Sequence, residues 1–373
     1  MNFARKVTVR MSAIGTPEQI EKSLSIQAGY WRRMNRDFVS ASGKVKGIGI
    51  EMGIRMIGTG SCLPKTVVTN DDLAKIMDTS DEWISSRTGI KERHLAKEET
   101  TAEMSTEAAL RAMEKAGVSA QEIDLIIVGT VSADHVTPSC ACEVQAAIGA
   151  VNAVAFDINA ACSGFMFALN IAHAYIQVGT YKTALIIGAE TLSKIMDWSD
   201  RSTCVLFGDG AGAAIVRADE REGLLAYDQG SDGARGGVLA CANRSNNNPL
   251  VQTPKELKYV HMDGQEVYKF AVTAVPASLH KVIETAGLTV EDIDYFALHQ
   301  ANIRILQSVA KRLKVSEDKF PISLDHCGNI SAASVPILLD EMNRKGLLKP
   351  RTKVALSGFG GGLTWASAVI EWG

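Results

Sequence analysis

An internal repeat is the feature of this sequence that most constrains its fold. Residues 114–128 read EKAGVSAQEIDLIIV and residues 284–298 read ETAGLTVEDIDYFAL, so that setting Glu114 on Glu284 makes an Ala-Gly pair and an Ile-Asp pair coincide as well. In both copies a strand-like apolar stretch follows. The repeat predicts a duplicated α/β unit whose two halves pack with approximate two-fold symmetry. We place these halves at residues 52–225 and 226–373.

A second match lies further along each half. Gly179 aligns with Gly346, and the same offset sets Cys162 opposite Asn329. The two halves would then place a cysteine and an asparagine at equivalent helix starts. Pseudo-symmetric packing would bring both helix starts to one central site.

The composition is that of an ordinary globular protein. Of the residues, 46% are hydrophobic and 22% charged, and the net charge of −3 argues against a general nucleic-acid-binding protein. Seven cysteines in 373 residues, an odd number, do not indicate a disulfide framework and favour reduced thiols. No apolar run approaches the roughly 20 residues that span a bilayer. We expect a cytoplasmic protein that binds neither nucleic acid nor membrane.

Residues 1–51 form an atypical basic extension, with nine Lys and Arg against four Asp and Glu. Three explanations stay open. The true start is Met52, which we favour; or the segment is a targeting sequence, which Glu18 and Glu21 weaken; or it is a genuine, poorly ordered extension. No apolar run follows the basic start, so the segment does not resemble a secretory signal.

Cys162 stands where a short extended segment gives way to small residues and then to a helix. Phe165, Leu169 and Ala172 recur at helical spacing after it. A cysteine at a helix N-terminus is stabilised as the thiolate by unpaired N–H groups and the helix dipole. A buried packing cysteine is the alternative, and on residue type alone it is the more common one.

Three further features accompany this cysteine. His299 directly follows the second copy of the repeated strand, at the kind of strand end where α/β sheets build sites. Asn329 precedes a helix rich in small residues, and by itself would be read as a helix cap. Residues 360–362 are three consecutive glycines, which suit a turn or an exposed row of backbone N–H groups.

Together these residues predict a site that handles thioesters. A thiolate can accept an acyl group while backbone N–H groups hold the oxyanion. Two neutral donors, an imidazole and an amide, can stabilise an enolate formed by loss of carbon dioxide. A cysteine protease would instead need the histidine placed as a base with an acid or amide behind it.

The sequence resembles the thiolase superfamily, and within it the β-ketoacyl-acyl carrier protein synthase III family. The resemblance covers roughly residues 53–373. It rests on the stretches TSDEWISSRTGIKERH (79–94), DINAACSG (157–164), FGDGAG (207–212), HQAN (299–302), GN (328–329) and GFGGG (358–362). It implies a five-layer αβαβα fold with two pseudo-symmetric halves. It also implies a homodimer that uses acyl-CoA and an acyl carrier protein as partners, with no cofactor and no metal.

The resemblance implies a role for each candidate residue. Cys162 takes the acyl group, and His299 and Asn329 promote decarboxylation of malonyl-acyl carrier protein. Gly361 shares the oxyanion hole with the N–H of Cys162, and Phe359 lies against the carboxylate that leaves. The implied reaction is a decarboxylative Claisen condensation that starts fatty acid synthesis.

The substrate-binding residues are likewise implied by the resemblance. Those for coenzyme A and pantetheine are Trp83, Arg87, Arg201, Gly264 and Asn302; those for the carrier protein are Gln300, Arg304, Lys311 and Arg312; those for the acyl pocket are Thr137 and Phe207. The alternative for the charged residues is an ordinary solvated surface.

One departure concerns Thr137, where the family often has a bulky residue. We expect a primer pocket that accepts acyl groups longer or more branched than acetyl. Two other functions stay open: acyl transfer to oxygen, nitrogen or a secondary-metabolite chain, and a catalytically dead partner subunit. The presence of Cys162 argues against the second.

Overall fold

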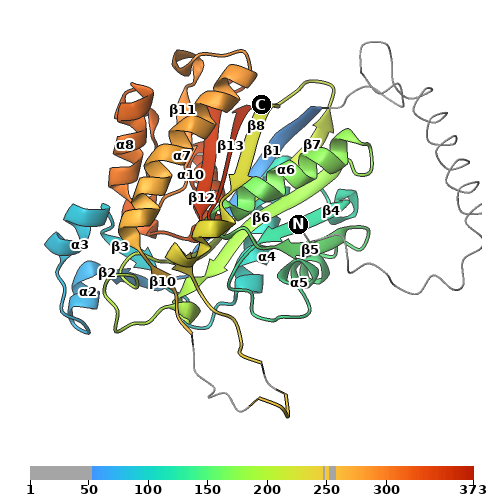
Figure 1. Ribbon diagram of the computed structural model, residues 1–373. Helices are drawn as coiled ribbons and strands as arrows, with labels where there is room; N and C mark the ends of the chain where they lie inside the picture. The colour runs from blue at the N-terminus through green and yellow to red at the C-terminus, as the bar shows by residue number, and fades with distance from the viewer. Residues whose placement is uncertain (1–52, 247, 252–257) are drawn as a thin grey trace, which may run out of the picture. The chain divides into compact units, whose positions relative to one another are not determined.

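The computed structural model describes residues 53–246, 248–251 and 258–373 (Figure 1). The expected basic extension, residues 1–51, and Met52 lie outside the described residues. Within the described part, no helix combines the length and the apolar character needed to cross a membrane.

Two separate sheets contain the long strands. The first has the order β1-β7-β6-β4-β5, with β1 (Gly53–Cys62), β7 (Asp209–Asp219), β6 (Thr183–Thr191), β4 (Leu125–Gly129) and β5 (Val154–Ile158). The second has the order β11-β12-β13-β8, with β11 (Tyr295–Leu298), β12 (Lys353–Gly360), β13 (Thr364–Glu371) and β8 (Leu224–Ser231). The chain passes from one sheet to the other between Asp219 and Leu224, close to the division expected after residue 225.

The two sheets share one pairing pattern. In the first, β4 pairs parallel with β6, and β6 pairs antiparallel with β7; in the second, β11 pairs parallel with β12, and β12 antiparallel with β13. The first sheet has one more strand, β5, paired parallel with β4. In the alignment that sets Leu125 on Tyr295, the place of β5 in the second half is taken by the short helix α9 (Leu324–Cys327).

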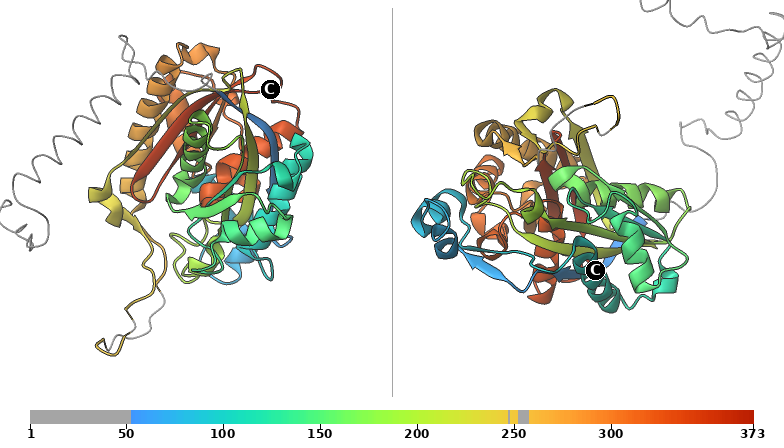
Figure 2. Two further views of the ribbon diagram at one scale, coloured as in Figure 1. Left: turned by 90° about the vertical axis from the view of Figure 1, so that its right-hand side faces the viewer. Right: turned by 90° about the horizontal axis from the view of Figure 1, so that it is seen from below.

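Helices separate and cover the sheets, and this gives five layers. Helices α6 (Gly164–Gln177) and α10 (Ser334–Arg344) lie between the sheets and contact both (Figures 1 and 2). Helices α4 (Thr101–Ala116) and α5 (Cys140–Ile148) cover the outer face of the first sheet, and α7 (Gly264–Thr285) and α8 (Ile303–Leu313) cover that of the second. The predicted layered, duplicated α/β fold is therefore confirmed.

Alternation along the strands explains the layers. In β4, Leu125 and Ile127 face the central core between the sheets, whereas Ile126 and Val128 face the outer core under α4 and α5. Every residue of β4 is buried. A strand buried on both faces reads as a continuous apolar run, which is why the repeat was visible in the sequence.

Several shorter elements complete the fold. One short helix begins after the cap Thr69 and ends at Ala74. The remaining short elements are β2 (Val67–Thr69), α2 (Asn70–Ala74), α3 (Asp81–Thr88), β3 (Glu92–His94), β9 (Leu239–Ala240) and β10 (His261–Met262).

The register of the repeat corrects one prediction. Two equivalent 3₁₀ turns, Ala161–Ser163 and Ser331–Ala333, precede α6 and α10, and their first residues share an unusual positive φ, 44° and 45°. Setting one turn on the other makes Cys162 correspond to Ala332 and not to Asn329. The counterpart of Asn329 is Asn159.

Helix length explains the wrong register. Gly179 and Gly346 both follow the helix ends with positive φ, 75° and 70°, and are true equivalents. Helix α10 is shorter than α6, however, with 11 residues against 14, so the offset changes between the turn and this glycine. The following loop is correspondingly longer, and β6 and β12 begin at Thr183 and Lys353, which restores the offset of the first repeat.

Candidate active site

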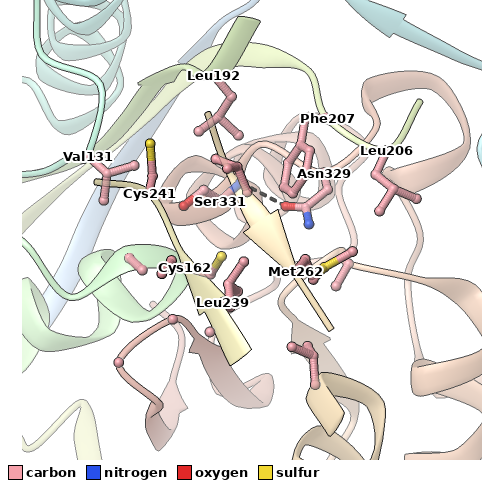
Figure 3. A pocket seen from close by; sticks show the side chains of 18 of the residues that line it. Val131, Cys162, Leu192, Leu206, Phe207, Leu239, Cys241, Met262, Asn329 and Ser331 are labelled. Atoms are coloured by element: carbon pink, nitrogen blue, oxygen red, sulfur yellow. Dashed lines mark hydrogen bonds between the residues drawn. The ribbon is translucent and has the colours of Figure 1, made fainter. Parts of the chain in front are cut away.

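One cavity of about 610 Å³ collects most of the predicted catalytic residues. Cys162, His299, Asn329, Phe359 and Gly361 all line it. They come from both halves: Cys162 from the turn before α6, His299 from directly after β11, Asn329 from just before the turn that precedes α10, and Phe359 and Gly361 from the end of β12 and the connection after it. Figure 3 shows Cys162 and Asn329 among the side chains that line the cavity. The structure thus brings together residues that lie far apart in the sequence.

Cys162 is held tightly against the glycine-rich connection. Its side chain is 8% exposed. A Cβ added to Gly360 would lie 2.9 Å from Sγ and 2.8 Å from Cβ of Cys162, so only glycine fits at this position. The close approach of β12 places the sulfur at the floor of the cavity.

Burial opposes the stabilisation of the thiolate that the position of Cys162 at a helix start predicts. Burial raises the pKa of the Cys162 thiol to about 11, opposed by a hydrogen bond with Ser331 and reinforced by the nearby Glu190. The residue does lie at a helix start, where the helix dipole favours the thiolate, whereas desolvation favours the neutral thiol. A neutral thiol would have to lose its proton before the sulfur could attack a carbonyl group.

His299 is a neutral, buried imidazole. Its side chain is 1% exposed, and its backbone N–H donates to the carbonyl of Ser357 over 2.8 Å. Burial lowers the pKa of the ring to about 3. Its Nδ1 finds no hydrogen-bond partner in the described part of the chain, and the ring of Phe359 packs edge-on at 5.1 Å. A neutral imidazole can donate one hydrogen bond into the cavity.

Asn329 both caps the turn and faces the cavity. Its backbone is fixed by two bonds to the neighbouring loop: its N–H donates to the Leu206 carbonyl at 2.9 Å, and its carbonyl accepts from the Gly208 N–H at 3.0 Å. Its Oδ1 accepts from the N–H of Ser331 over 2.9 Å (Figure 3). Because the oxygen is committed to this N–H donor, the amide NH₂ points away from Ser331 and remains available as a donor.

Three predicted binding residues also line the cavity: Phe207, Gly264 and Asn302. Phe207 forms a parallel bridge with Asn329. Asn302 caps α8 by accepting from the N–H of Arg304 over 2.9 Å, and donates to the carbonyl of Arg87 over 3.1 Å. It therefore ties the cavity wall to α3.

The predicted coenzyme A residues form a separate surface cluster. The guanidinium groups of Arg87 and Arg201 lie 4.7 and 5.3 Å from the ring centre of Trp83. Arg201 also pairs with the fully exposed Asp78 at 3.1 Å. None of Trp83, Arg87 and Arg201 lines the cavity. The cluster offers an aromatic face and two cations together.

The prediction that Gln300 contacts a carrier protein is wrong. Its side chain is 1% exposed. It donates to the carbonyl of Leu298 and accepts from the N–H groups of Ser323 and Leu324, at 2.9 to 3.1 Å, so it braces the loop after β11 instead.

The other predicted carrier-protein residues, Arg304, Lys311 and Arg312, are exposed on α8. Thr137 is exposed and does not line the cavity of its own chain.

Sequence reasoning missed Glu190, a buried carboxyl close to Cys162. Its Oε2 accepts from Val131 N–H at 3.0 Å and from the hydroxyls of Thr130 and Ser132. Burial raises the pKa of Glu190 to about 7. The hydroxyl of Ser331 lowers the pKa of both Glu190 and Cys162 and so lies beside each. The sequence signal that could have revealed Glu190 is an acidic residue within the otherwise largely apolar strand 183–191.

Fold and site together define an acyl-transferring enzyme of the thiolase-like class. Two family models match the chain: "3-Oxoacyl-[acyl-carrier-protein (ACP)] synthase III" over residues 156–233, and the C-terminal part of the same family over residues 283–372. The chain belongs to the β-ketoacyl-acyl carrier protein synthase III family.

Individual relatives agree with this assignment. A β-ketoacyl-[acyl-carrier-protein] synthase III of Clostridium acetobutylicum is 54% identical, covering 86% of this chain and 98% of the relative; one of Streptococcus sanguinis is 50% identical, covering 82% and 95%. The crystal structure of the Aquifex aeolicus 3-oxoacyl-[acyl-carrier-protein] synthase III has a TM-score of 0.80 at 44% identity, covering 86% of this chain and 100% of that chain. The priming β-ketosynthase of the R1128 polyketide pathway has a TM-score of 0.83 at 36% identity, covering 87% and 98%.

Proposed function

We propose that this cavity catalyses the decarboxylative condensation of an acyl-CoA primer with malonyl-acyl carrier protein. The observation that carries the proposal is the convergence of a cysteine thiol, a neutral imidazole and an amide donor on one cavity. The products are 3-oxoacyl-acyl carrier protein, coenzyme A and carbon dioxide. The reaction starts a fatty acid chain in the cytoplasm and needs no cofactor besides its two thioester substrates.

In the first half-reaction the sulfur of Cys162 attacks the thioester carbonyl of acyl-CoA. The N–H groups of Cys162 and Gly361 hold the oxyanion, and coenzyme A leaves as the free thiol. The thiol proton of Cys162 needs an acceptor. His299 has a pKa of about 3 and is a poor base, whereas Glu190, with a pKa of about 7, receives the proton through the Ser331 hydroxyl. The proton ends on the departing coenzyme A sulfur.

In the second half-reaction His299 and Asn329 donate hydrogen bonds to the thioester oxygen of the malonyl group. As carbon dioxide leaves, negative charge develops on that oxygen, and two preorganised neutral donors stabilise it. The ring of Phe359, packed beside His299, gives the leaving carboxylate an apolar neighbour. The enolate carbon then attacks the acyl-cysteine, and the Cys162 sulfur leaves as a thiolate that takes one proton from solvent, so that the complete reaction consumes one proton.

Substrate binding is assigned to surfaces around this cavity. The Trp83 indole, with Arg87 and Arg201 against it, suits the adenine and phosphates of coenzyme A. Gly264 and Asn302 line the path for pantetheine. The exposed cations of α8, Arg304, Lys311 and Arg312, suit an acidic carrier protein.

The primer pocket involves a second copy of the chain. Thr137 is exposed in one chain, where it can reach a partner's cavity across a homodimer. Because threonine is small, we propose primers longer or more branched than acetyl. Intact-mass measurement after incubation with acetyl-, isobutyryl- and octanoyl-CoA tests this, and adduct formation with acetyl-CoA alone would contradict it.

Two measurements test the function as a whole. Wild-type protein should gain one acyl mass on Cys162 and release carbon dioxide from malonyl-acyl carrier protein. Cys162→Ala should lose acylation and condensation but keep decarboxylation, because His299 and Asn329 are untouched. Normal condensation by this variant would refute the proposal. Acylation without any carbon dioxide release would instead favour acyl transfer to oxygen or nitrogen.

A further inference from the structure

A cluster of metal-ligating side chains lies outside the cavity lining, on α9 and α10. His326, Cys327 and Glu341 each offer one donor atom, and these three atoms all lie within 4.8 Å of one another. Cys327 is 2% and Glu341 7% exposed, whereas the side chain of His326 is 37% exposed. Two of the three residues are therefore buried, and His326 makes the cluster accessible from solvent.

Neighbouring charged side chains already orient these donors. Asp325 Oδ1 lies 2.8 Å from Nδ1 of His326, which turns the other ring nitrogen, Nε2, toward Glu341 Oε1, also at 2.8 Å. Lys345 holds the far oxygen of Glu341 at 3.1 Å. The sulfur of Cys327 is 3.9 Å from Glu341 Oε1. A carboxylate that fixes the tautomer of a histidine in this way is the usual support of a histidine ligand in a metal site.

We propose that His326, Cys327 and Glu341 form a binding site for a divalent cation of the zinc class. A thiolate, an imidazole and a carboxylate are the donors that zinc accepts, and they leave a fourth tetrahedral position for water. Magnesium and calcium select all-oxygen sites and are excluded by the sulfur. Only small side-chain shifts are needed to bring the three donor atoms to tetrahedral spacing.

The position of the cluster gives the metal a structural consequence. Cys327 is two residues before Asn329, and Glu341 lies on the central helix α10. A metal joining them clamps the turn that carries Asn329 onto the helix that follows it. The resemblance implies no metal, and Glu341 becomes a neighbour of His326 and Cys327 only through the fold.

Cobalt binding tests the site. The full chain is prepared as Cys162→Ala, which removes the reactive thiol, then stripped with a chelator and titrated with Co²⁺. We expect one equivalent to bind with a thiolate-to-cobalt charge-transfer band, and Zn²⁺ to displace it. The matched control Cys162→Ala with Cys327→Ser retains every other thiol and should lose the band.

Two further variants keep the test decisive. Asp325→Asn should weaken cobalt binding about 10- to 100-fold while keeping the band, because the carboxylate that orients the His326 ligand is lost. His326→Gln, at a partly exposed position, should lose tight binding even if the Cys327 variant does not fold. Absence of a band in Cys162→Ala, or a band that survives both changes, would overturn the proposal and leave a metal-free ion-pair network. Both outcomes are independent of condensing activity.

Discussion

Substitution of Gly360 by alanine should separate positioning of the nucleophile from the rest of the chemistry. The added Cβ would lie 2.9 Å from Sγ and 2.8 Å from Cβ of Cys162. Nonbonded carbon atoms rest at about 3.5–4.0 Å, so one partner must move by roughly 1 Å. Misplacement of a reacting group by about 1 Å slows catalysis on the order of 100-fold, or about 2.7 kcal/mol in the barrier. Overpacking should also lower the free energy of unfolding by about 1–3 kcal/mol.

The assay is single-turnover acylation of Gly360→Ala, followed by intact mass, beside urea unfolding. Decarboxylation of malonyl-acyl carrier protein should fall much less, because the atoms nearest the added Cβ all belong to Cys162 and not to His299 or Asn329. Gly233→Ala is the matched control, since a Cβ there meets nothing within 4 Å. Wild-type acylation by folded Gly360→Ala would refute the close packing of the glycine connection on Cys162.

Three further predictions concern His299, Glu190 and the coenzyme A cluster. Burial lowers the folded-state pKa of His299 from 6.5 to about 3; the unfolded chain thus binds more protons below pH 6.5, and stability falls with decreasing pH, by up to about 1.4 kcal/mol per pH unit from this group. Urea unfolding of His299→Gln at pH 7 and pH 5 should lack this loss. The acylation rate of wild-type protein should rise as Glu190 ionises near pH 7, and that of Glu190→Gln should be slower and lack this rise; an unchanged pH profile would exclude Glu190 as the acceptor. Trp83→Ala should raise KM for acyl-CoA about tenfold with little change in kcat, since base stacking stabilises by about 1–3 kcal/mol, whereas an unchanged KM would remove Trp83 from the binding site.

The layered fold could be predicted because its signals are local. The buried strands β4 and β11 read as apolar runs in matching contexts, and each copy of the repeat carries an Ala-Gly pair at the end of the helix before the strand, where Gly117 has a positive φ of 63°. The exact register could not be predicted. Helix α10 is shorter than α6, and the loop that follows α10 is longer by the same amount. The alignment offset between the two halves therefore changes only from the end of the helix to the start of the next strand, and no single sequence position marks this change.

The residues that meet at the candidate site were predictable, but their electrostatic state was not. Cys162 was recognised from its small neighbours, yet its raised pKa depends on the β12–β13 connection, which arrives from the far end of the chain. Gln300 has the polarity of a surface residue, and its burial is explained by its hydrogen bonds with the carbonyl of Leu298 and the N–H groups of Ser323 and Leu324. Glu190 joins the candidate site through its proximity to Cys162, which strand periodicity does not reveal.

The corrected register shows how a duplicated chain makes an asymmetric site. Asn159 and Asn329 are equivalent, and each accepts from the N–H two residues on, at 3.3 and 2.9 Å, so the same cap shapes the turn in both halves. The first half adds the sulfur where the second has Ala332. The second half adds His299 where the first has Gly129, whose missing side chain lets the backbone of Gly164 pack 2.8 Å from the position a Cβ would take. Each half therefore keeps the shared turn for structure, while the proposed nucleophile and donors are divided between the halves.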